Sequence, residues 1–228
     1  MPGKVPVRAT RAAALLLALG ALAYTAWLLE VLVRTGLDPV RTYVSELAAA
    51  DQPLGGLFRA TDLAAGLLVL AGALAGLVAT RRHGPWALGG WIALAVFGAA
   101  TVADSRLPLS CAPTADPECA ARETAGLVPA THLAHAVSSS LAMTGALAAM
   151  VALTVAARRY GHWRPLARTG PALVVLELAA TAWTLAAVAA FEAGKGTWSL
   201  GAGQRLQVLL VAVWLAVLAG SLPRRRAR

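Results

Sequence analysis

Long apolar stretches alternate with short polar segments along the whole chain. Six of these stretches are about as long as, or longer than, the ~20 residues that a helix needs to cross the hydrocarbon core of a bilayer. We place them at residues 12–33, 56–80, 86–104, 128–157, 170–191 and 204–222. The pattern predicts an all-α protein, a polytopic membrane bundle of six transmembrane helices, with residues 1–228 forming a single membrane domain.

The composition agrees with a membrane protein, and it affects how the positive net charge is interpreted. Apolar residues make up 58% of the chain and charged residues 14%, with a mean hydropathy of +0.66, whereas a soluble domain is close to half apolar. The net charge of +9 does not indicate nucleic-acid binding, because the basic residues flank the apolar stretches. We therefore predict the lipid bilayer as the environment and no nucleic-acid partner.

The distribution of charge predicts an orientation. Short cytoplasmic loops of membrane proteins are enriched in Lys and Arg. Thirteen of the 20 basic residues lie in segments 1–11, 81–85, 158–169 and 223–228, which contain no acidic residue: Lys4, Arg8, Arg11, Arg81, Arg82, Arg158, Arg159, Arg164, Arg168, Arg224, Arg225, Arg226 and Arg228. We expect both termini to be cytoplasmic and the protein to lie in the inner, or plasma, membrane of a cell. The long connections 34–55 and 105–127 then face outwards.

The first apolar stretch has one alternative interpretation. Arg8 and Arg11 precede an apolar run with small residues near position 23, which is also the pattern of a cleaved signal peptide. The run continues to Val33, which is long for such a peptide, so we favour a retained helix.

Both cysteines of the chain, Cys111 and Cys119, fall in the connection 105–127. Disulfides form in oxidising compartments, and the predicted orientation places this connection in one. The sequence therefore predicts a disulfide between Cys111 and Cys119 in preference to two free thiols.

Polar and ionisable residues gather at the predicted outer ends of the helices. Ionisable groups are costly at membrane depth and indicate function or pairing. We predict a polar pocket at the outer face made of Ser45, Glu46, Arg59, Asp62, Asp104, His132 and His135. Ser139 continues the face of the two histidines by another turn.

Simpler interpretations remain open for these residues. Arg59 and Asp62 have the spacing of an ion pair within one helix, and so do Glu30 and Arg34. His132 and His135 are compatible with interfacial residues that bond to loop carbonyls. Glu177, an acidic residue well inside a span, is compatible with pairing to Ser or Thr, or with a proton-relay role.

A metal site is a further possibility. His132 and His135 lie three residues apart on one helical face, and Asp104 is a candidate oxygen ligand, so zinc is a possible cofactor. Ceramidase-like membrane hydrolases are distantly similar in combining Ser, Asp and His at one face. They use histidines from more than one helix, however, and this chain has no other histidine on that face.

Several short motifs, taken in order, point to a family. A Ser-Glu-Leu sequence follows the first span at Ser45–Leu47, an acidic residue, Asp104, ends the third span, and the segment Asp104–Thr114 is followed by Asp116, Cys119 and Thr131–His135. These features resemble the bacterial membrane-protein family called domain of unknown function 998, in particular its actinobacterial members. The resemblance covers nearly the whole chain and implies a six-helix membrane architecture; it implies no activity.

We expect an uncharacterised multi-pass membrane protein whose extracytoplasmic pocket binds a lipid headgroup, a small molecule or a membrane-protein partner. One alternative is a metal-dependent hydrolase acting at the outer leaflet, in which a metal held by the histidines activates water. A second is a transporter, although the chain shows no inverted repeat.

Overall fold

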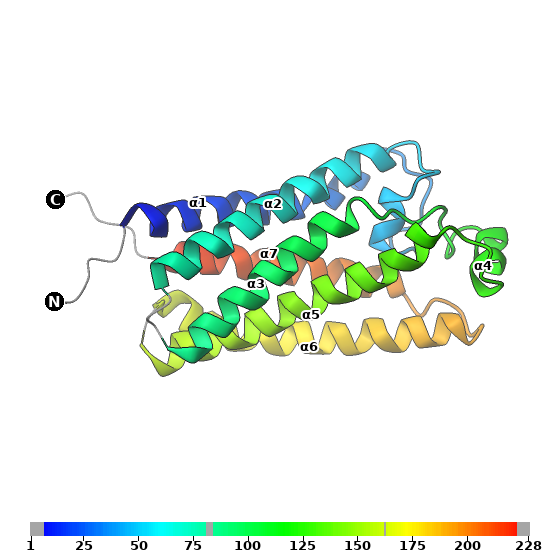
Figure 1. Ribbon diagram of the computed structural model, residues 1–228. Coiled ribbons are helices and arrows are strands. Elements are labelled where there is room, and N and C mark those ends of the chain that lie inside the picture. Colours follow the sequence, from blue (N-terminus) through cyan, green and yellow to red (C-terminus); the bar gives the residue numbers. More distant parts are fainter. Residues whose placement is uncertain (1–6, 81–83, 162, 223–228) are drawn as a thin grey trace.

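The computed structural model describes residues 7–80, 84–161 and 163–222, and all the regular secondary structure in those ranges is helical. Its α-helices and 3₁₀ helices, shown in Figure 1, are α1 (Val7–Tyr24), η1 (Ala26–Val31), η2 (Val44–Ala48), α2 (Gly55–Thr80), α3 (Pro85–Asp104), α4 (Pro117–Thr124), α5 (Ala130–Arg159), α6 (Arg164–Glu192) and α7 (Leu200–Ser221). Lys4, Arg81, Arg82, His83, His162 and the four basic residues at 224–228 lie outside the described residues.

Within the part of the chain that the structure describes, six helices are long and apolar enough to cross a membrane, which confirms the predicted fold class. They run antiparallel along one axis, so that the first residues of α1 and the last residues of α7 lie at the same end of the bundle (Figure 1). The opposite end carries the long connections 32–54 and 105–129, and we call it the loop end.

The six spanning helices form a closed ring. Each packs against its neighbours along the chain, from α1 to α2, α3, α5, α6 and α7, and α7 packs back against α1. Glycines allow the closest approaches: a Cβ atom on Gly98 of α3 would lie 2.6 Å from the backbone nitrogen of Leu70 in α2, and one on Gly145 of α5 would lie 2.9 Å from that of Phe97. Small residues at these positions permit the backbone-to-backbone packing that holds helices together in lipid.

The first span differs from the single straight helix expected over 12–33. The α-helix ends at Tyr24, and a 3₁₀ helix continues from Ala26 to Val31. Thr25 explains the change, because its backbone N–H and its hydroxyl both bond to the carbonyl of Leu22, at 3.1 and 2.7 Å. This i to i−3 pattern is that of a 3₁₀ turn.

The two long connections fold against each other at the loop end and contain elements that periodicity did not predict. The 3₁₀ helix η2 lies in the first, and the short helix α4 lies in the second. Asp116 caps α4 by accepting a hydrogen bond from the backbone N–H of Glu118 at 2.9 Å, as short polar side chains do at helix N-termini. The backbone N–H of Ala50 bonds to the carbonyl of Leu109 at 2.8 Å, which joins the two connections.

Candidate functional site at the loop end

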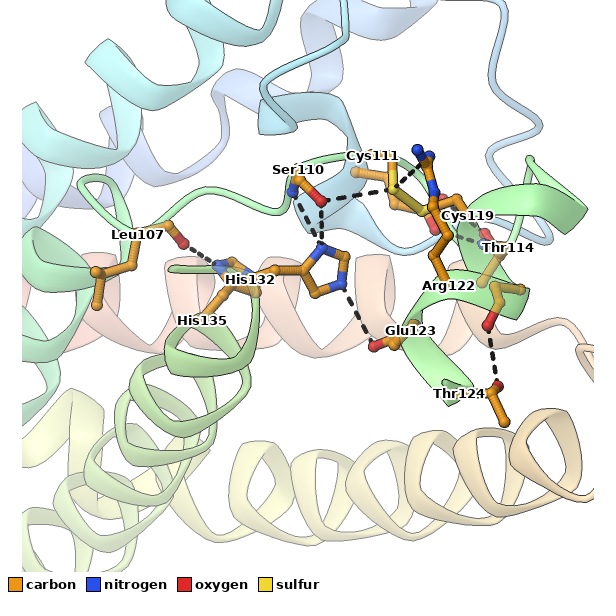
Figure 2. A network of polar contacts seen from close by, with 12 residues as sticks. Leu107, Ser110, Cys111, Thr114, Cys119, Arg122, Glu123, Thr124, His132 and His135 are labelled. Atoms are coloured by element: carbon orange, nitrogen blue, oxygen red, sulfur yellow. Dashed lines mark hydrogen bonds and ion pairs between the residues drawn. A yellow bond between two sulfur atoms is a disulfide. The ribbon is translucent and has the colours of Figure 1, made fainter. Parts of the chain in front are cut away.

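The predicted disulfide is present in the second connection. Cys111 and Cys119 are bonded and almost fully buried, and they bring the start of this connection next to α4 (Figure 2). The Arg122 side chain lies 3.6 Å from the sulfur of Cys111.

Glu46 fixes the first connection to the second. Its side chain is fully buried, and it accepts hydrogen bonds from the backbone N–H of Thr114 at 2.7 Å and from the Thr114 hydroxyl at 2.6 Å. Burial raises the pKa of the Glu46 carboxyl from 4.5 to about 7, while the hydrogen bonds from Thr114 oppose this rise. Glu46 is therefore a structural residue of the loops, and its neighbour Ser45 remains partly exposed.

The raised pKa of Glu46 predicts a dependence of stability on pH. The folded protein holds the Glu46 proton more tightly than the unfolded chain, so the free energy of unfolding should fall as the pH rises from 4.5 to about 7, by up to about 3 kcal/mol. The variant Glu46→Gln does not ionise and should lack this component. Unfolding in detergent over a series of pH values measures the difference between the two proteins. The exposed Asp51 offers a control, Asp51→Asn, which should behave as wild type; parallel curves for wild type and Glu46→Gln would contradict the assignment.

Arg59 also binds a loop, and the alternative interpretation of an ion pair with Asp62 is not the arrangement found. Its guanidinium donates to the carbonyls of Ala48 and Ala49, at 2.7 and 3.1 Å. None of the four ion pairs in the described residues joins Arg59 to Asp62. Since α2 begins directly after the first connection, the Arg59 side chain binds the carbonyls at the end of η2. Asp62 has no ion pair with any of the described residues.

His132 contacts the second connection through both ring nitrogens (Figure 2). It is 1% exposed, and its Nδ1 accepts a hydrogen bond from the backbone N–H of Ser110 at 3.1 Å, with the Ser110 hydroxyl at 2.9 Å. Its Nε2 lies 3.4 Å from a carboxylate oxygen of Glu123 in α4. Because a backbone N–H only donates, Nδ1 must carry the lone pair and Nε2 the hydrogen.

The two ring nitrogens of His135 have the opposite roles to those of His132. Its Nδ1 lies 3.0 Å from the carbonyl of Leu107 and 3.2 Å from Oδ1 of Asp104. Both partners accept hydrogen bonds, so Nδ1 carries the hydrogen, and in the neutral ring the lone pair is on Nε2. Ser138 donates a hydrogen bond to the same Asp104 oxygen. Asp104, Ser138 and the carbonyl of Leu107 thus fix the orientation and tautomer of His135.

Within the described residues, the Nε2 atom of His135 is buried and has no hydrogen-bond partner. The Nε2 atom of His132 also lacks a hydrogen bond, but it has the Glu123 carboxylate at 3.4 Å, whereas the contact of His135 with Asp104 is made by Nδ1. Buried polar atoms are normally satisfied, and each exception calls for an explanation, such as a bound water or ligand. Nε2 of His135 is the one acceptor of its ring that the protein leaves available.

The opposed tautomers bear on the predicted metal site of His132, His135 and Asp104. A metal needs a lone pair from each histidine, and the lone pair of His132 already faces the backbone N–H of Ser110. Within residues 7–80, 84–161 and 163–222, no group of three or more His, Cys, Asp or Glu side chains is placed to hold a metal ion. Zinc binding would require the second connection to release His132, and it stays a prediction without support from this geometry.

Asp62 and Tyr24 extend the cluster into the bundle. The carboxyl group of Asp62 lies close enough to that of Asp104 for the two to repel each other. The hydroxyl of Tyr24, at the end of α1, is within electrostatic reach of Asp62, Asp104 and Glu177. The structure therefore separates the seven predicted pocket residues. Asp104 contacts His135, with Asp62 near them, whereas Glu46, Arg59 and His132 bind the loops and Ser45 stays partly exposed in η2.

Some polar residues of this region were not predicted from sequence. Ser138, and not Ser139, contacts Asp104; the Ser139 hydroxyl bonds to the carbonyl of His135 at 2.9 Å. Glu30 does not pair with Arg34: its carboxylate binds Arg205 of α7 through two contacts of 2.6 and 2.7 Å. The available signal was that Glu30 and Arg205 are opposite charges at the same end of two spans.

Comparison with known proteins places this architecture in a family. The family model described as "Protein of unknown function (DUF998)" matches residues 12–221. The chain belongs to this family. Apart from residues 7–11 at the start of α1, its six spanning helices and the loop-end elements η1, η2 and α4 lie within the matched range. No curated protein and no solved structure matches the chain. Membership of the DUF998 family and the six apolar helices together identify a multi-pass membrane protein.

Proposed function

We propose that the protein binds a small polar ligand or a lipid headgroup at the loop end, with Nε2 of His135 as the atom that recognises it. The observation that carries this proposal is the buried, unpartnered Nε2 on a ring whose other nitrogen is fixed. A structural histidine in such a position is expected to have a partner at both nitrogens, and Nε2 of His132 has at least the Glu123 carboxylate at 3.4 Å. A ring oriented in advance with one free acceptor reduces the cost of ordering a binding group.

The charges around this atom favour a ligand with hydrogen-bond donors. Asp104 lies 3.2 Å from the other nitrogen of His135, and Asp62 lies near Asp104 without a cation among the described residues. A hydroxyl or ammonium group would supply a donor to Nε2 and a favourable charge or dipole to the carboxylates. The amine headgroup of a phospholipid and a free small amine share this chemistry.

The orientation of the protein supports an external site. The basic residues of the described helices at the end opposite the loops include Arg158, Arg159, Arg164 and Arg168, and such enrichment is typical of the cytoplasmic side. On this basis the loop end faces away from the cytoplasm, where a ligand would reach it from the outer leaflet or the external solution.

The test exploits the difference between the two nitrogens of His135. In His135→Asn the amide nitrogen takes a position similar to that of Nδ1, so the contacts to Leu107 and Asp104 can persist while the Nε2 acceptor is removed. Native mass spectrometry of the protein in nanodiscs, formed with the lipids of the membrane from which it is extracted, should show a bound lipid or metabolite in the wild type. In the variant the affinity for this ligand should fall by about tenfold or more, which corresponds to the loss of one hydrogen bond of ~1.4 kcal/mol.

The control is His132→Asn, which changes a histidine that the structure assigns to loop packing. It should retain the ligand once the protein is folded. An unchanged adduct in His135→Asn and His135→Ala, or no adduct in the wild type, would overturn the proposal. Elemental analysis of the same samples tests the hydrolase alternative: about one zinc ion per chain, lost when both histidines are replaced, would favour a metal centre instead.

A further inference from the structure

Three buried glutamates of the described residues differ in how their charges are satisfied. Glu30 binds Arg205 through two oxygens at 2.6 and 2.7 Å. Glu46 receives two hydrogen bonds from Thr114. Glu177 is fully buried, and both of its carboxyl oxygens lack a hydrogen-bond partner of good geometry. The carboxylates of the two glutamates at the loop end therefore have hydrogen-bond or ion-pair partners, whereas the carboxyl group of Glu177 in α6 has none of good geometry among the described residues.

The surroundings of Glu177 are polar although the residue is inside a membrane-spanning helix. Thr181 and Thr184 lie one and two turns further along α6, on the same helical face. Gln207 of α7 donates a hydrogen bond to the Thr181 hydroxyl at 2.9 Å, and both side chains lie beside the Glu177 carboxyl. The Thr184 hydroxyl is also buried and without a hydrogen-bond partner.

These groups form a row that leads towards the loop end. Because α6 ends at that end of the bundle (Figure 1), Thr181 and Thr184 succeed Glu177 in that direction. On α1, the Tyr24 hydroxyl is within electrostatic reach of Glu177 and also of Asp62 and Asp104.

We propose that Glu177, with Thr181 and Gln207, forms a site between α6 and α7 that reversibly binds a proton. An ionised carboxylate without a cation or hydrogen bonds is strongly unfavourable away from water, and none of the four ion pairs of the described residues includes Glu177. A bound proton removes this cost and supplies an O–H that Thr181 or Gln207 can accept. A residue needed for packing alone would be served by an apolar side chain, and ionisable residues within spans mark ion or proton sites. The inference uses different side chains from the ligand proposal and does not depend on it.

Infrared spectroscopy tests the protonation state directly. The difference spectrum between wild type and Glu177→Gln, recorded in lipid at neutral pH, should contain the C=O stretching band of one protonated carboxylic acid. That band should disappear reversibly as the pH is raised and be replaced by carboxylate bands. Glu177→Gln resembles the protonated form in shape and polarity, so it should fold as the wild type does.

Chemical labelling provides a second, independent readout. Dicyclohexylcarbodiimide is apolar and adds to protonated carboxyl groups in apolar surroundings, and the adduct is located by peptide mass spectrometry. Glu177 should be labelled, while Glu192, which is exposed at the end of the same helix, should not. Carboxylate bands at neutral pH in the difference spectrum would overturn the proposal. A carboxylic acid band that persists at every pH at which the protein stays folded would also overturn it, because the proton would then not exchange.

Discussion

Arg205→Ala is expected to lower the free energy of unfolding by about 3–5 kcal/mol, because it leaves the buried Glu30 carboxylate without a counter-charge. The Glu30 and Arg205 side chains are only 5% and 8% exposed. Arg205 also donates to the backbone carbonyls of Thr42 and Gly201, at 2.8 and 3.2 Å. The guanidinium therefore joins three parts of the chain, η1, the first connection and α7. Denaturant unfolding in mixed micelles, followed by circular dichroism, measures the loss.

Two comparisons separate this effect from a general sensitivity to charge. The pair Arg41 and Asp38 is exposed, at 73% and 52%, with a separation of 3.6 Å, so Asp38→Asn should change stability by less than about 1 kcal/mol. The double variant Glu30→Leu with Arg205→Met replaces the ion pair by apolar groups and should recover most of the loss. Equal effects of Arg205→Ala and Asp38→Asn would show that the buried pair does not stabilise the fold.

Replacing Cys111 and Cys119 by serine is expected to destabilise the second connection by about 2–3 kcal/mol, the usual contribution of a short disulfide-closed loop. The cysteines are eight positions apart and almost completely buried. Their bond supports the segment that presents Ser110 to His132 and Thr114 to Glu46. Without it, the connection should open more often and expose its basic residues to protease.

Limited trypsin digestion measures that opening. Arg106 and Arg122 flank the disulfide and are exposed, and 2–3 kcal/mol corresponds to an increase of about 30- to 150-fold in the open population. Cleavage at both sites should accelerate in the double serine variant and in reduced wild type, while Arg158 and Arg159 at the other end of the bundle serve as internal controls. Equal cleavage rates at Arg106 and Arg122 with and without the disulfide would contradict the prediction.

The residues that satisfy polar groups at the loop end illustrate the limit of sequence patterns. Helical spacing allowed Arg59 to pair with Asp62 and favoured a pair between Glu30 and Arg34, since these partners are neighbours on one helix surface. In the structure Arg59 binds the carbonyls of Ala48 and Ala49, and Glu30 binds Arg205. In both cases the side chain binds a group that is distant in sequence and is brought near by the fold, and not the neighbour on its own helix. A hydrogen bond or ion pair between buried, fixed groups stabilises the fold more than one between exposed neighbours.

The sequence by itself determined the all-helical, six-span architecture, the disulfide between its two cysteines and the family to which the chain belongs. Apolar runs near the thickness of a bilayer and two cysteines eight positions apart are properties of the chain alone. Only the tertiary structure decided which polar residues hold the loops and which remain unsatisfied. His132 and His135 are indistinguishable by spacing, yet one faces the N–H of Ser110 and the other the carbonyl of Leu107. The tautomer of each ring, and hence the free acceptor on His135, depends on contacts between segments that no local pattern encodes.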